Sequence, residues 1–84
     1  MYPKAAAVAR MAAASQNWTV AKLAEVAGVS RDSLASAHSG RRPLPPGFEA
    51  WLLAKTDIKL QAFGLRRHNV LAAQAERRRE VSDG

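Results

Sequence analysis

Cysteine is absent from this chain of 84 residues, and its two histidines do not have the spacing of metal ligands. Neither a disulfide framework nor a zinc site can therefore stabilise the fold, and we expect no metal and no cofactor. The chain must be held together by the packing of its own core, for which 48% hydrophobic residues suffice in one small domain.

Long hydrophobic runs are also absent. No segment approaches the roughly 18 apolar residues of a membrane-spanning helix, so we expect no membrane association. The first residues, MYPKAAAVARMAAAS, superficially resemble a secretory signal. Arg10 interrupts what would have to be the apolar region of that signal, so we expect an intracellular protein.

Patterns of catalytic residues are equally scarce. The chain has no Ser/His/Asp or Cys/His set, no paired catalytic carboxylates and no glycine-rich phosphate loop. A domain of this size also has little room for a substrate pocket. We therefore expect neither an enzyme nor a small-molecule substrate.

Acidic residues are few. Seven Asp and Glu stand against thirteen Lys and Arg, which gives a formal net charge of +6. In a soluble domain this excess points first to a polyanion, with nucleic acid the main candidate; an anionic membrane surface is the lesser candidate and not the expected partner.

Alternating β-branched residues are missing, whereas alanine is abundant, so the sequence predicts an all-α fold. We expect one domain of five helices over residues 1–80, with a frayed tail at 81–84. The helices are expected at 3–14, from residue 19 to 27, at 30–39, at 46–55 and from about 57 to about 80, with Gly64 as a candidate break. The expected inward stripe of the first helix consists of Val8, Met11, Ala12 and Ser15.

Two short helices with a glycine between them occupy residues 20–40. Thr19 and Ser30 are good N-caps, and each precedes one of the two helices. Gly28 lies where the first of them must end, because a positive φ costs glycine little, and Gly40 ends the second. Ala24 is small enough to let the helices cross closely. These features are the sequence requirements of a helix-turn-helix.

The segment VAKLAEVAGVSRDSLASAHSG, residues 20–40, resembles the helix-turn-helix of the lambda repressor and Cro family of phage and bacterial regulators. The residues that match the family's small, turn, core and closing positions, without gaps, are Ala24, Gly28, Val29, Leu34 and Gly40. The resemblance implies a compact five-helix DNA-binding domain with the motif at its second and third helices. It also implies a cytoplasmic or nucleoid location in a bacterium, with a bacterial or phage gene.

The same resemblance implies which residues contact DNA. The helix at 30–39 would lie in the major groove of double-stranded DNA, with its N-terminal end leading. The family's base-reading positions correspond to Arg31, Asp32, Ala35 and Ser36. An arginine there can donate two hydrogen bonds to guanine, a carboxylate can accept one from cytosine, and a methyl group can contact thymine. The expected phosphate contacts are Thr19, Lys22, Ser39, Arg41 and Arg42.

Some of these residues have a plainer interpretation. Arg31 is as well suited to a phosphate as to a base, and Asp32 in a first turn suits the helix dipole. The segment ERRRE at 76–80 is a second DNA-contacting tail, a partner-binding end or, by default, a solvated helix end.

The sequence thus predicts a sequence-specific transcriptional regulator, repressor-like or Cro-like. One such module buries only about 600–1,000 Å² on DNA, so we expect a homodimer. The residues left over for its interface, once the motif is packed, are Leu65, Val70, Leu71 and Ala75. The alternative is a protein-binding module on the same fold, with a host polymerase, a toxin or another regulator as its partner.

Overall fold

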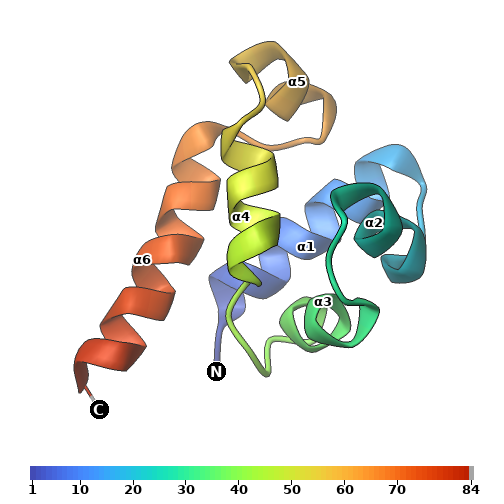
Figure 1. The fold of residues 1–84 in the computed structure, drawn as a ribbon. Coiled ribbons are helices and arrows are strands. Elements are labelled where there is room, and N and C mark those ends of the chain that lie inside the picture. Colours follow the sequence, from blue (N-terminus) through green and yellow to red (C-terminus); the bar gives the residue numbers. More distant parts are fainter. Residues whose placement is uncertain (84) are drawn as a thin grey trace.

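The structure is a computed structural model that describes the backbone of residues 1–83 and the side chains of residues 1–78. Within this part the chain forms six helices and no strand, which confirms the all-α prediction. The helices are α1 (Pro3–Gln16), α2 (Val20–Ala27), α3 (Arg31–His38), α4 (Pro46–Leu53), α5 (Asp57–Ala62) and α6 (Arg67–Asp83), as Figure 1 shows.

The number of helices differs from the expected five because residues 57–80 do not form one continuous helix. Gly64 has a φ of 72°, and its N–H donates to the Gln61 carbonyl while the Leu65 N–H donates to the Leu60 carbonyl. These bonds close the end of α5. The side chain of Asn69 then accepts a hydrogen bond of 2.8 Å from the Arg66 N–H and caps the start of α6. The break lets α6 turn back and pack against α1 and α4.

Other boundaries differ by a few residues. α1 continues to Gln16, two residues past the expected end, and stops at Asn17, whose φ of 56° is left-handed. α4 ends at Leu53 rather than at residue 55. α6 continues to Asp83, so its backbone enters the segment 81–84 for which we expected fraying, and Gly84 lies outside the described residues.

α1 is the central helix of the packing, with α3 against one part of it and α6 against another. Its buried residues are Ala5, Ala6, Val8, Ala9, Ala12 and Ala13. The expected stripe was therefore partly wrong, since Met11 is 39% exposed and Ser15 is exposed. Because α1 faces two neighbours, alanines cover a broad buried face that lets both helices approach closely, and the long Met11 side chain stays outside.

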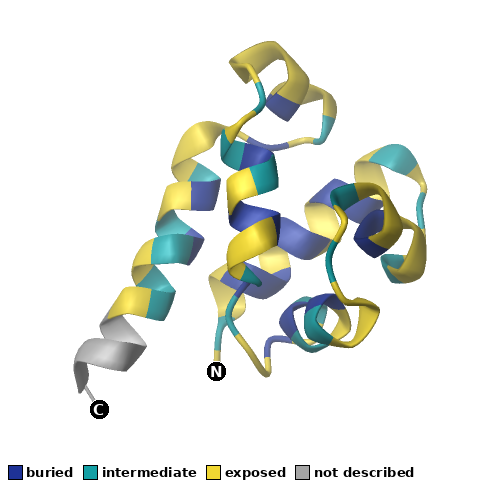
Figure 2. Cartoon of the chain, in the orientation of Figure 1, coloured by how far each residue is buried: buried dark blue, intermediate teal, exposed yellow. Residues whose placement is uncertain are grey.

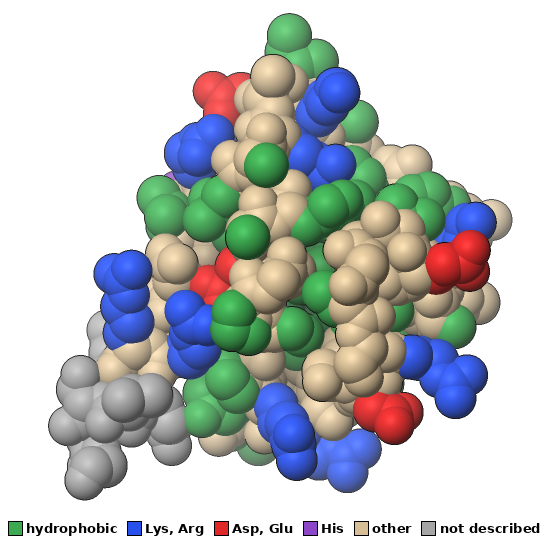
Figure 3. Space-filling view, in the orientation of Figure 1, with side chains coloured by type: hydrophobic (Ala, Val, Ile, Leu, Met, Phe, Trp, Pro, Cys, Tyr) green, Lys and Arg blue, Asp and Glu red, His purple; other side chains and the backbone are tan. Residues whose placement is uncertain are grey.

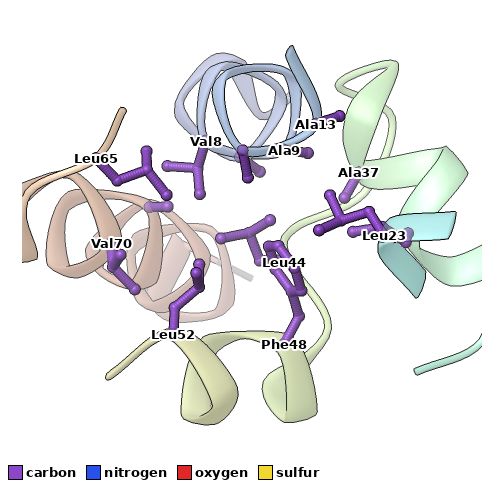
Figure 4. Close-up of a cluster of buried hydrophobic side chains, with 14 of the residues drawn as sticks. Val8, Ala9, Ala13, Leu23, Ala37, Leu44, Phe48, Leu52, Leu65 and Val70 are labelled. Atoms are coloured by element: carbon purple, nitrogen blue, oxygen red, sulfur yellow. The ribbon is translucent and has the colours of Figure 1, made fainter. Parts of the chain in front are cut away.

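The core is made of aliphatic side chains from all six helices and of Phe48. Figure 4 shows Val8 of α1, Leu65 just before α6, Val70 of α6, and Leu52 and Phe48 of α4 pointing toward a common centre. Leu44, in the loop between α3 and α4, is 1% exposed and reaches into the same cluster. By contrast, α5 contributes only Leu60 and is otherwise exposed (Figure 2). Burial of this apolar surface is the main stabilising term of the fold.

Partly buried aromatic rings join α4 to the ends of α1 and α5. Trp51 stacks on Phe48 with ring centroids 5.7 Å apart and meets the edge of Phe63 at 5.5 Å. Phe63 in turn contacts Trp18 at 6.1 Å. Both tryptophans therefore pack against this chain's own rings.

Candidate nucleic-acid interface

The turn between α2 and α3 is built as the sequence predicts. Gly28 has a φ of 73°, and its N–H and that of Val29 donate to the carbonyls of Glu25 and Ala24, at 3.3 and 3.0 Å. A Cβ at Gly28 would meet no atom within 4 Å, so the positive φ alone favours glycine here. The Ser30 hydroxyl then accepts from the Ser33 N–H at 3.4 Å and starts α3.

Thr19 caps α2 in the same way, since its hydroxyl accepts from the Lys22 N–H at 3.1 Å. Both predicted N-caps are thus confirmed. Ala24 is 2% exposed and lies where α2 packs against α3, as its small size led us to expect. The two helices are held together by burial of Leu23 and Leu34, which are fully buried.

α3 has one buried and one exposed side. Leu34 and Ala37 are 0% exposed and face the core. Three of the four residues expected to meet bases, Arg31, Asp32 and Ala35, are exposed. Ser36 is half-buried and lies at the edge of that surface. Arg31 and Asp32 occupy the first turn of the helix, so its leading end is open to solvent.

The other end of α3 is closed by the glycine that the sequence predicts and by two contacts from residues distant in the sequence. Gly40, with a φ of 82°, is followed by Arg41, whose N–H donates to the Ser36 carbonyl at 2.9 Å. The Tyr2 N–H donates to the Gly40 carbonyl at 2.9 Å, and Arg10 Nε of α1 donates to the His38 carbonyl at 3.0 Å. α3 is thereby held at its last turn as well as by its buried side.

The expected phosphate contacts are all exposed and lie at the start of α2 and in the segment that follows α3: Thr19, Lys22, Ser39, Arg41 and Arg42. Ser39 makes hydrogen bonds within the chain. Its hydroxyl donates to the Ser36 carbonyl at 2.9 Å and accepts from Arg41 Nε at 3.2 Å. A serine hydroxyl has one proton to donate, so in this conformation Ser39 orients Arg41, and its expected contact with a phosphate stays a prediction that requires the hydroxyl to rotate.

Basic side chains gather near this end of the molecule. Figure 3 shows Lys and Arg along its lower edge, over α3 and the loop that follows it and beside the described end of α6, with single acidic groups between them. An excess of cations around an exposed helix is the electrostatic footprint of a polyanion-binding surface.

The expected dimer residues do not share one surface. Leu65 is 1% and Val70 0% exposed, and both belong to the core of their own chain. That part of the prediction was wrong because the break at Gly64 turns α6 onto α1, which buries these two side chains. Leu71, 46% exposed, and Ala75 remain on the outer face of α6.

The segment 76–80, interpreted by default as a solvated helix end, makes two specific contacts. Glu76 accepts hydrogen bonds from the N–H groups of Lys4 and Ala5, at 3.1 and 3.2 Å, and so caps α1. Arg77 Nη1 lies 3.0 Å from Oε1 of Glu49, which is 2% exposed on α4. No side chain beyond Arg78 is described.

Glu49 is an unusual group for a helical core. Neither of its carboxylate oxygens accepts a hydrogen bond of good geometry from the described residues, although Arg77 is close. Burial raises the pKa of Glu49, against the opposing effect of the Arg77 and Arg78 charges and of the nearby Gln74 amide. The pair links α6 to α4.

None of the helices in residues 1–83 is both long and apolar enough to cross a bilayer. Comparison with known proteins gives no further guide to function, because no protein-family model, no curated protein and no solved structure matches this chain.

Proposed function

We propose that this protein is a transcriptional regulator of the lambda repressor and Cro type that binds specific sequences in double-stranded DNA. The observation that carries the proposal is α3 itself. It is a short helix fixed at its last turn, with Arg31, Asp32 and Ala35 exposed along one side. A helix of this kind can enter the major groove without reorganising, which keeps the entropic cost of binding low.

Recognition would proceed from the leading end of α3. Arg31 can donate two hydrogen bonds to O6 and N7 of a guanine, a contact that contributes about 1–3 kcal/mol of discrimination. Asp32 can accept from a cytosine amino group, the Ala35 methyl can meet a thymine methyl, and Ser36 lies at the edge of this contact. Thr19, Lys22, Arg41 and Arg42 would contact phosphates on either side of the groove and set the register of α3.

A single domain of this size supplies only modest affinity, so the proposal includes a homodimer on a two-fold operator. Leu71 and Ala75 are the exposed apolar residues of α6 that can pair across the two-fold axis. Sedimentation equilibrium of a Leu71→Glu variant tests this surface. A dimer that persists unchanged in this variant excludes it.

The function is tested first by selecting bound duplexes from a random pool, which reports DNA binding, site length and palindromy together. On a selected duplex, log K should fall with log salt with a slope near −5, as expected for about six neutralised phosphates. Arg31→Ala should relax preference at one operator position, whereas Lys22→Ala should weaken all sequences alike. Equal effects of the two variants would contradict the assignment of Arg31 to a base.

The second candidate function is that of a protein-binding module, and one observation favours it. The exposed residues of α4 and its C-cap are Pro46, Gly47, Ala50 and Ala54, so this outer surface carries no charge. Uncharged exposed helix surfaces are typical of contacts with another protein. A salt-independent affinity for duplex DNA, or none, would favour this alternative.

A further inference from the structure

A hollow of about 330 Å³ lies beside the proposed recognition helix. It is lined by Ser33 of α3, by Arg42 and the residues 43–46 that lead into α4, and by Arg77 of α6. Two arginines from distant parts of the sequence thus meet in one concave site. None of the residues that line it is acidic.

We infer that this hollow binds one phosphodiester of the DNA backbone, held between the guanidinium groups of Arg42 and Arg77, with its sugar against the proline wall. The inference rests on the proposed function and adds a residue from α6 to the DNA interface. It also gives the basic segment at 76–80 a role in binding that its sequence alone left open.

The wall of the hollow is rigid. Pro43, Pro45 and Pro46 have a fixed φ and no N–H group that would need a partner. Leu44 between them is 1% exposed and anchors the loop in the core. The Pro45 carbonyl accepts from the N–H groups of Phe48 and Glu49, at 3.0 and 3.1 Å, and joins the loop to α4. A site whose shape exists before binding loses little entropy when a ligand enters.

Arg77 is held in place by Glu49. Its Nη1 lies 3.0 Å from the buried carboxylate of Glu49, while the side chain of Arg77 remains 27% exposed. A guanidinium group has five N–H donors in a planar fork, so contact with Glu49 leaves others for a phosphate oxygen. Glu49 itself does not line the hollow. It is therefore a positioning residue, which orients one arm of the site without touching the phosphate.

The charge around the hollow also favours an anion. Arg42 and Arg77, which line the hollow, supply two positive charges against the one nearby carboxylate of Glu49, a sum of +1 when Glu49 is ionised, and the Arg78 charge also acts on that carboxylate. Ser33 belongs to α3, so the hollow adjoins the helix proposed to enter the major groove. Since phosphates line both edges of that groove, a cationic hollow next to the inserted helix faces one of them.

A second basic hollow provides a matched control. It is lined by Asp57, Gln61, Arg66, Arg67 and His68 and measures about 390 Å³. Here the acidic Asp57 lies 3.8 Å from Arg67 and offsets its charge. The residues that line it belong to α5, to the start of α6 and to the link between them, which lie away from α3 in Figure 1. It has the same kind of residues without the proposed contact to DNA.

The test is a double-mutant cycle on a duplex selected with the wild-type protein, with dissociation constants measured at several salt concentrations. Arg42→Gln should weaken binding about tenfold per half-site near 0.1 M salt and make the salt slope shallower by about 0.9 per half-site, the counterion term of one phosphate. Arg77→Lys keeps a charge beside Glu49 but loses the fork, so it should weaken binding several-fold. Because the two arginines share the same phosphate, the fold-loss of affinity in the double variant should be smaller than the product of the fold-losses in the two single variants.

Arg66→Gln is the matched control and should leave affinity unchanged. Fully multiplicative losses in the cycle would show that the two arginines do not share a phosphate and would overturn the inference. So would wild-type affinity for both Arg42→Gln and Arg77→Lys. Equal affinities of Arg42→Gln and Arg66→Gln would also contradict the site, whether or not Arg77→Lys folds. A wild-type protein without affinity for any duplex overturns the proposed function and this inference together.

Discussion

Replacement of Glu76 by alanine should destabilise the whole domain. Glu76 caps α1, although the two lie near opposite ends of the sequence. Its carboxylate accepts two backbone hydrogen bonds, from Lys4 and Ala5, and α1 has neither a side-chain N-cap nor an acidic residue in its first turn. Glu76 therefore takes the place of both. Loss of an N-cap costs about 0.5–2 kcal/mol, and loss of a favourable charge at a helix N-terminus about 0.3–1 kcal/mol.

Because Lys4 is exposed and water can replace part of the cap, we expect a loss of about 1–2 kcal/mol in the free energy of unfolding for Glu76→Ala. For a domain of this size, each kcal/mol lowers Tm by about 4–8 °C. Glu76→Gln keeps an acceptor but loses the charge, so it should cost about half as much.

Urea denaturation, monitored by the fluorescence of Trp18 and Trp51 and by circular dichroism, measures the loss in the free energy of unfolding. Glu25→Ala, which removes an exposed glutamate of α2, is the control and should stay within about 0.5 kcal/mol of the wild type. Amide exchange at Ala5 should also accelerate in Glu76→Ala. If the Glu76 and Glu25 variants unfold at the same urea concentration, the cap contributes nothing and the reasoning fails.

Three further predictions concern stability. Gly28→Ala should cost about 1–2 kcal/mol from backbone strain alone, because a Cβ there meets no atom within 4 Å; a loss above about 3 kcal/mol in chemical denaturation would mean that the turn rearranges. Leu34→Ala should cost about 2–5 kcal/mol, since Leu34 is fully buried, whereas Val26→Ala at a 40% exposed site should cost well under half of that in the same assay. Glu49 has a pKa raised above 4.5 in the folded state, so its contribution to stability is greatest below pH 4.5 and falls as pH rises through the folded pKa. Glu49→Gln should remove this component, and parallel pH profiles of unfolding free energy for the two proteins would contradict the assignment.

Features that depend on neighbours within a few residues were predictable from the sequence. The N-caps Thr19 and Ser30 bond to N–H groups three residues ahead, and the left-handed glycine at 28 closes its helix through residues just before it. In each case the residue type and its local position determine the interaction. The exposed leading end of α3 followed from the same local pattern.

Contacts of charged side chains with groups distant in the sequence were not predictable. Nothing in the sequence around Glu49 indicates that its side chain is buried against Arg77, and nothing near Arg10 indicates a bond to the His38 carbonyl. Such pairs depend on how the helices pack, which a periodic pattern does not specify. The error at Leu65 and Val70 had the same origin, because they were assigned to a surface before the direction of α6 was known.

The hydrogen bond between the Tyr2 N–H and the Gly40 carbonyl has a practical consequence for experiments on this protein. It brings the first residues of the chain to the loop that carries Arg41 and Arg42, so a peptide fused ahead of Met1 would emerge next to that loop. An acidic fusion tag would compete there for the arginines with the DNA that we propose as the ligand, and a polyhistidine tag would alter the local charge as pH falls. Binding measurements therefore need protein from which any such tag has been removed.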